Sequence, residues 1–218
     1  SPGAVLRGDG VSINGHVQLT RVSSTASGGA ISTNSSTSQI VELGSLTATD
    51  VHSSGGLGGV IETSGGINIE GHAELSNVSS SGGGGAFYNN SNSISVSLGS
   101  LSATDVTSSG GPGGVIQSSG GISIQGHSEL LRVEATTAPG GAFRDYSSGG
   151  ITLGTISANT VSSGSIGGVT ATSGPAVIDS ITGNNISAGG PGGVIYGLED
   201  VTVGEVNISN SLANGPGG

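Results

Sequence analysis

Three histidines recur after glycine along the chain, and imidazole is the side chain most often used to bind transition metals or to move protons near neutral pH. His16, His72 and His127 stand in the tripeptides NGH, EGH and QGH, at spacings of 56 and 55 residues. Zinc requires all its ligands within about 2.1 Å of a single ion. A repeat of this length places equivalent residues in separate units, so the spacing predicts histidines at surface corners and no metal site.

Carboxylates are the second candidate, because clustered Asp and Glu residues perform the acid–base steps of glycoside cleavage. Asp50 and Asp105 occupy matching places in the sequence, as do Glu74 and Glu129, and neither pair falls within one repeat unit. The chain also contains no Lys to assist them. The pattern therefore predicts no catalytic site and no enzymatic activity.

Calcium is the remaining chemical possibility for the acidic residues. Glu70 with Glu74, or Glu199 with Asp200, would supply oxygen ligands, but no acidic loop has the spacing of a calcium-binding motif. We expect these side chains to be solvated, and the sequence predicts no metal and no cofactor.

Composition and charge exclude several other classes of protein. Fourteen Asp and Glu residues against four Arg give a net charge of −10, which is unsuited to binding nucleic acid. No apolar run approaches the roughly 18 residues that a membrane-spanning helix needs, so direct membrane insertion is not expected. The absence of Cys excludes a disulfide scaffold. The absence of Met predicts that the chain is a processed or excised piece of a longer product.

Internal repetition is the strongest signal in the sequence. A Gly-Gly pair followed by Ala or Val, and then usually by a larger apolar residue, recurs at intervals of 25 to 30 residues, at Ala30, Val60, Ala86, Val115, Ala142, Val169 and Val194. A longer period lies over the short one, since residues 44–60 match residues 99–115 at an offset of 55. The units therefore alternate between two types.

Each unit contains three short segments with the alternation of apolar and polar residues that is typical of strands. In one unit they are residues 60–63, 67–71 and 73–78. The outward positions of the third segment are expected to form one column along the repeat: Thr20, Thr49, Ser76, Thr104, Leu131, Asn159, Asn184 and Ser209.

Three strands in about 27 residues predict an all-β parallel β-helix, a solenoid in which stacked units bury one continuous core. We expect a single domain over residues 1–218 with about eight coils, uncapped at both ends. The coils are expected near residues 1–30, 31–60, 61–86, 87–115, 116–142, 143–169, 170–194 and 195–218.

The residues from Ile181 to Ile195, ITGNNISAGGPGGVI, resemble the repeat of polymorphic outer-membrane proteins, which pairs an FxxN motif with a following GGA(I/L/V). Residues 75–87 and 156–169 are similar, although Leu or Ile replaces the Phe and Val often replaces the Ala. The resemblance covers most of the chain. It implies a right-handed β-helix of the kind found in autotransporter adhesins, located outside the cell or on its surface, with a host or cell-surface glycan or protein as partner.

An apolar residue follows the Ala or Val of most repeats, and strict alternation cannot place both inside. Either a corner turns both inward, which the pairing of Phe with Ala favours, or one of them forms a lateral apolar ridge that would bind a partner. The stripe consists of Ile31, Ile61, Phe87, Ile116, Phe143 and Ile195.

The ends of the chain match its interior, and neither end shows a capping segment. Residues 1–5 resemble 139–143, and residues 215–218 resemble 111–114 and 190–193. Two functions remain open: a surface adhesin or display rod, with binding loops at 32–39 and 88–93, or a subunit of an extracellular filament. In the second case the end coils would stack on another copy or on a longer parent chain, through Val5, Val11, Ile13, Val201, Val203 and Val206.

Overall fold

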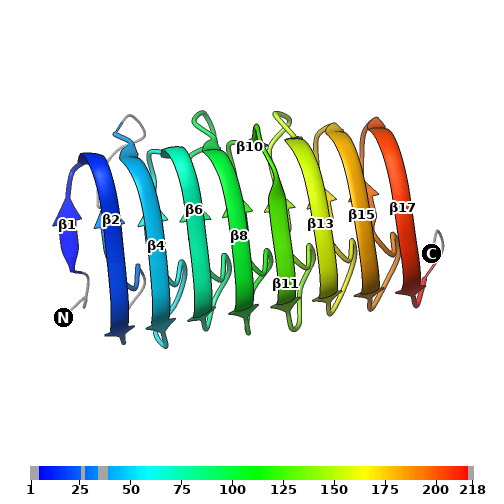
Figure 1. The fold of residues 1–218 in the computed structure, drawn as a ribbon, viewed down its shortest axis with the longest axis horizontal. Helices are drawn as coiled ribbons and strands as arrows, with labels where there is room; N and C mark the ends of the chain where they lie inside the picture. Colours follow the sequence, from blue (N-terminus) through cyan, green and yellow to red (C-terminus); the bar gives the residue numbers. More distant parts are fainter. Residues whose placement is uncertain (1–4, 26–27, 34–38, 216–218) are drawn as a thin grey trace.

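The chain forms a parallel β-helix, as the repeat predicts. A computed structural model describes residues 5–25, 28–33 and 39–215, and all the regular structure in them is β-strand. Parallel strands stack in register into a solenoid with a period near 27 residues, and the chain runs from one end of the rod to the other (Figure 1). Parts of the predicted end matches (1–4 and 216–218) and of the 32–39 loop (34–38) lie outside the described residues.

Two sheets run along the rod. The short-strand sheet stacks β1, β3, β5, β7, β9, β12, β14 and β16 in chain order, and the long-strand sheet stacks β2, β4, β6, β8, the pair β10 and β11, β13, β15 and β17. The eight layers of strands make about seven turns of the solenoid. The short strands are β1 (Leu6–Gly8), β3 (Ile31–Thr33), β5 (Ile61–Thr63), β7 (Phe87–Asn89), β9 (Ile116–Ser118), β12 (Phe143–Asp145), β14 (Thr170–Thr172) and β16 (Ile195–Gly197). The long strands are β2 (Val11–Ser24), β4 (Val41–Ser53), β6 (Ile67–Ser80), β8 (Val96–Ser108), β10 (Ile122–Ile124), β11 (Ser128–Ala135), β13 (Ile151–Ser163), β15 (Ala176–Ala188) and β17 (Val201–Ala213).

The second and third predicted strands of each unit are joined into one bent strand. In β6 the pairing with β8 passes from Ile69 opposite Leu98 to His72 opposite Ser100, so β6 carries one residue more than its partner at this point. Such an extra residue is a β-bulge, which bends a strand without ending its sheet. The Gly-His tripeptides mark the bulge, and among the described strands only β10 and β11 are separated at this point.

A second bend lies in the same place in every turn and is made by one residue in the left-handed conformation. In β4, Thr49 and Asp50 both face outward and Val51 returns to the core, with Asp50 at a φ of 55°. Asn and Asp tolerate this conformation better than most residues. The full column has φ between 51° and 57° and consists of Arg21, Asp50, Asn77, Asp105, Arg132, Thr160, Asn185 and Asn210. The neighbouring outward column predicted from Thr20 to Ser209 is confirmed by the strand register.

The two-unit period has a packing origin in the core. In β4 the large Leu46 is followed two residues later by Ala48, and in β6 the order is reversed to Ala73 and Leu75. Strand β8 returns to the first order with Leu101. Large side chains therefore lie beside small ones across successive turns, an arrangement that favours close packing of the interior.

The apolar stripe belongs to the core, and the alternative of an exposed lateral ridge is wrong. Its members in β3, β5, β7, β9 and β12 are fully buried, and Ile195 in the last turn is half-buried. The cause is a corner in the backbone: the amides of Ala86 and Phe87 both donate to the Val115 carbonyl, at 3.0 and 2.9 Å. Successive amides of a straight strand point to opposite sides, so the chain bends here and both side chains turn inward.

Two inward hydroxyls in the described part of the chain, those of Ser128 and Thr170, are buried without a hydrogen-bond partner, and Ser128 allows a test of stability. The Ser128 hydroxyl is buried between Leu101 and Ile156 and has no hydrogen bond, whereas the equivalent position two turns earlier is Ala73. Ser128→Ala should raise the free energy of unfolding by about 1 kcal/mol, because an orphaned buried hydroxyl costs about 1–3 kcal/mol. Urea unfolding measures the change. The outward Ser102→Ala is the control and should alter stability by less than about 0.5 kcal/mol; a Ser128→Ala chain no more stable than its parent would contradict the packing.

Candidate functional site

The histidines do not converge on one site. Each of the four binds a hydroxyl of the next turn through Nδ1: His16 with Ser45 at 2.8 Å, His52 with Ser79 at 2.9 Å, His72 with Ser100 at 2.9 Å and His127 with Thr155 at 2.8 Å. The predicted surface position of His16, His72 and His127 is confirmed, since all three are exposed. These contacts tie neighbouring turns together, as cross-strand pairs do in any sheet.

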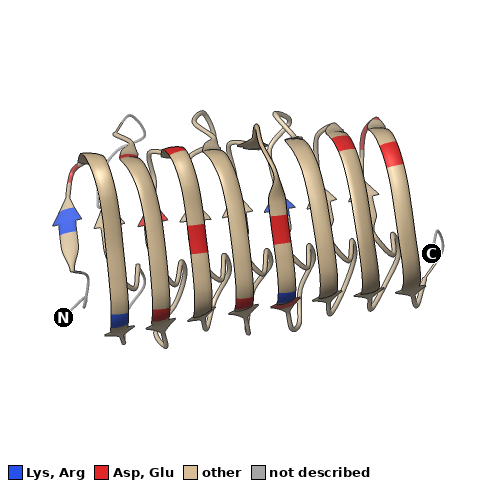
Figure 2. Cartoon of the chain, viewed as in Figure 1, with Lys and Arg blue, Asp and Glu red and all other residues tan. Residues whose placement is uncertain are grey.

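The carboxylates of the long-strand sheet are spread along the rod (Figure 2). Asn77 lies between Asp50 and Asp105 in the left-handed column and donates to Asp50 Oδ1 at 2.7 Å. Glu74 and Glu129 are likewise separated by a full turn, which holds Ser102. Within residues 5–25, 28–33 and 39–215, no three His, Asp or Glu side chains are placed to share a metal ion.

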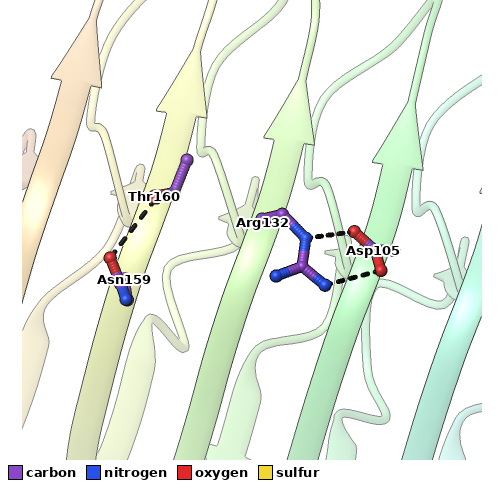
Figure 3. Close-up of polar contacts among 4 residues, drawn as sticks. All are labelled: Asp105, Arg132, Asn159 and Thr160. Atoms are coloured by element: carbon purple, nitrogen blue, oxygen red, sulfur yellow. Dashed lines mark hydrogen bonds and ion pairs between the residues drawn. The ribbon is translucent and has the colours of Figure 1, made fainter.

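One ion pair joins adjacent turns in the same left-handed column. Arg132 donates from Nε and Nη2 to the two oxygens of Asp105, at 2.5 and 2.8 Å (Figure 3). The hydrogen bond from Arg132 holds the pKa of Asp105 below its usual value. On the next turn, Thr160 donates to Asn159 within its own strand (Figure 3). Both groups are exposed, so these contacts order the bend rather than form a site.

The short-strand sheet carries a different surface, which the sequence analysis missed. Each three-residue strand has one outward position, in its centre, between two inward ones. The central column is Arg7, Ser32, Glu62, Tyr88, Gln117, Arg144, Ala171 and Tyr196. It holds two of the three tyrosines, and the third, Tyr146, follows β12 directly. In the sequence, the residue that directly follows each member of the apolar stripe belongs to this column.

The Gly-rich loops fold back over this column and bury much of it. A side chain on Gly83 would lie 1.6 Å from Gln117 Oε1, and one on Gly140 would lie 3.2 Å from the Cβ of Arg144. As a result Ala171 is completely buried and Arg144 is only 7% exposed, although both face away from the core. Glycine is required in these loops because the outward side chains occupy the space beside them.

Arg144 is the most unusual group on this face. Its guanidinium lies 4.2 Å from the centre of the Tyr146 ring, and Nη2 donates to Ser173 Oγ at 3.3 Å. Its Nε and Nη1 are buried without a hydrogen-bond partner, and so is Oε1 of Gln117 in the adjacent turn. Buried polar groups are almost always satisfied, so unpaired donors and an unpaired acceptor side by side indicate a place for a polar ligand or for water.

Burial raises the pKa of two groups on this face, Glu62 and Tyr88. Desolvation raises the pKa of Glu62, and Arg7 opposes the shift. Desolvation also raises the pKa of Tyr88, and the nearby Glu62 and Tyr146 add to the effect. The face therefore combines aromatic rings, a guanidinium and an amide around a carboxyl that ionises reluctantly.

The predicted binding loop at 88–93 is held in place from within. Asn89 and Ser91 are fully buried. Asn89 donates to the Ile94 carbonyl at 2.6 Å and accepts from the Ser91 amide at 3.0 Å. Of this loop, Tyr88 is the residue that presents a large side chain on the short-strand face.

Comparisons of the chain with protein-family models, with curated proteins and with solved structures found no match. The likeness to polymorphic outer-membrane proteins therefore stays a prediction from the repeat motifs. In the described part of the chain no helix has the length and apolar character to cross a membrane.

The buried carboxyl of Asp145, beneath this face, makes the free energy of unfolding depend on pH. Asp145 is fully buried, and burial raises its pKa even though it accepts hydrogen bonds from the amides of Gly121 and Ser147, at 2.9 and 3.1 Å. The folded chain thus holds this proton more tightly than the unfolded chain. The resulting stability is complete below the unfolded pKa of about 3.9 and is lost as the pH rises through the folded pKa.

Asp145→Asn removes this dependence and should keep the local structure, because Asn89 fills the same column two turns earlier and accepts from Ser91 in the same way. Urea unfolding from about pH 3 to about pH 7 should show the variant gaining stability over the parent as the pH rises. A difference between the two chains that does not change with pH would contradict a raised pKa at Asp145.

Proposed function

We propose that the chain is a non-enzymatic extracellular rod that acts as a surface adhesin or display module, with the short-strand face as its binding surface. The observation that carries the proposal is the placement of the three tyrosines, Arg144 and Gln117 on one face of an otherwise Ser- and Thr-rich solenoid. Binding sites are typically rich in aromatic side chains and carry a few placed polar groups.

Display rather than catalysis is favoured by the spacing of the acidic groups. Equivalent carboxylates such as Asp50 and Asp105 lie two turns apart, which at about 4.8 Å per turn is about 10 Å. The two carboxyls of a glycosidase lie about 5–5.5 Å apart in retaining enzymes and about 6.5–9.5 Å apart in inverting ones, and here Asn77 occupies the layer between Asp50 and Asp105 and is hydrogen-bonded to Asp50. The likeness of the repeats to adhesin passengers agrees with an extracellular location and with a host or cell-surface glycan or protein as partner.

A filament subunit is the second candidate, and the ends of the solenoid favour it. In the described chain, β17 pairs only with β15 and β2 only with β4, so each has one free edge. Val5, Val201 and Val206 are 59%, 45% and 59% exposed, while Val11, Ile13 and Val203 are half-buried. An unpaired edge with apolar side chains accepts a further layer, either from the same polypeptide or from another copy of it.

Binding to a glycan array and to intact cells tests the adhesin, with electron microscopy of the same sample to reveal fibres. We expect bound glycans or cells, and at least a tenfold loss of affinity in Tyr88→Ala/Tyr146→Ala, since tenfold corresponds to about 1.4 kcal/mol. The control is Thr49→Ala on the long-strand sheet, which should bind as the parent does. Absence of binding to any glycan or cell surface would contradict an adhesin, and fibres in that sample would favour the filament.

A further inference from the structure

The strongest unexplained feature of the molecule is the set of unpaired polar atoms around Arg144. We propose that this set is a binding subsite for the carboxylate of an acidic saccharide, with Arg144 as the anchor and with Gln117, Tyr88 and Tyr146 around the sugar ring. The proposal rests on the adhesin function and specifies the class of ligand that the short-strand face takes.

The guanidinium supplies the charge and the free donors. A guanidinium has five N–H groups, and for Arg144 only the contact from Nη2 to Ser173 uses one of them. Leaving buried donors unsatisfied destabilises a fold, so a partner that accepts from Nε and Nη1 is expected. Among biological acceptors a carboxylate matches best, because it is planar, carries two oxygens and forms charge-assisted hydrogen bonds with Arg.

The neighbouring turns supply groups for the remainder of a sugar. Gln117 lies directly beside Arg144 in the sheet register, and its amide oxygen, which is buried against the loop at Gly83, has no hydrogen-bond partner among the described residues. Tyr88 is on the turn before Gln117, and burial raises its pKa, with smaller contributions from the nearby Glu62 and Tyr146. Two aromatic rings beside a buried polar pair provide the apolar surface and the fixed hydrogen bonds of a small-ligand site.

The surrounding charges permit an anion here despite the net charge of −10. Asp145 is adjacent in the chain but points to the opposite side of the sheet, where it is fully buried and has a raised pKa. Glu62 lies three turns away along the column, and its pKa is also raised. Among the described residues, no carboxylate lies within ion-pair distance of the Arg144 guanidinium.

Access to the guanidinium runs past Tyr146. The ring of Tyr146 covers one face of the Arg144 guanidinium, and Tyr146 is 45% exposed, so its side chain borders solvent. On binding, the carboxylate of the sugar would replace the Tyr146 ring as the group in contact with the Arg144 guanidinium. The ring would then pack on the sugar.

Titration calorimetry with the full chain tests the subsite, with sialyllactose and digalacturonic acid as acidic probes and lactose as the neutral match. We expect the acidic sugars to bind at least tenfold more tightly than lactose. Arg144→Gln should remove that preference. The variant is expected to fold, because Gln117 occupies the same column one turn earlier, and thermal unfolding checks this. Arg21→Asn, which removes one positive charge on the other sheet at a position where Asn recurs, should leave the preference intact.

Two results would overturn the subsite. If neither acidic sugar binds more tightly than lactose, or if Arg144→Gln binds them as the parent does, the unpaired donors of Arg144 are satisfied by water only. Binding of neutral glycans that survives Arg144→Gln would refute this subsite and leave the adhesin function standing. Absence of any glycan or cell binding would refute both.

Discussion

The structure depends on stacking each residue on its own counterpart in the next turn. A chain with 45 Gly and 2% aromatic residues has too few large side chains for an ordinary globular core. Parallel pairing in constant register solves this, because the inward Ile, Leu and Val side chains of the interior turns then pack between the inward residues of the turns above and below and are removed from water. Any error in register would expose all the apolar side chains of a turn at once.

The bends of each turn are what keep the register constant. The left-handed residue, which precedes a Val in the first six turns and Ile186 and Ser211 in the last two, sets one corner. The pair of amides that share an acceptor, as at Ala86 and Phe87, sets another. Because both corners recur at fixed positions, insertions fall in loops outside them, and the bulge at the Gly-His tripeptides accommodates an extra residue without shifting the core.

Much of this could be predicted from the sequence. The 27-residue period, the parallel β-helix and the outward column from Thr20 to Ser209 follow from repetition and alternation alone. The left-handed corner could not be predicted in this way, because Arg21, Asp50 and Thr160 share a backbone conformation but have different side-chain chemistry. The outer face of the short strands was missed for a related reason: each turn contributes one residue to it, and a single position has no alternation to reveal it.

The same geometry explains why function, as we propose it, belongs to the face of the short strands. On the long-strand sheet, repetition places like groups at intervals of whole turns, so His and carboxylate side chains pair with hydroxyls, with an amide or, at Asp105, with a guanidinium, and not with one another. On the short-strand sheet, successive turns differ, and Tyr88, Gln117 and Arg144 bring different chemistry together in three neighbouring layers.

Distances between spin labels test the stacked register most directly, and the absence of Cys makes the labelling specific. Labels at Thr20 and Leu131 lie four layers apart in the same outward column, and labels at Thr20 and Asn184 lie six layers apart. At about 4.8 Å per layer, the account predicts backbone separations of about 19 Å and about 29 Å, with narrow distributions. Equal distances for the two pairs, or broad distributions without a fixed increment per layer, would contradict a register-locked solenoid.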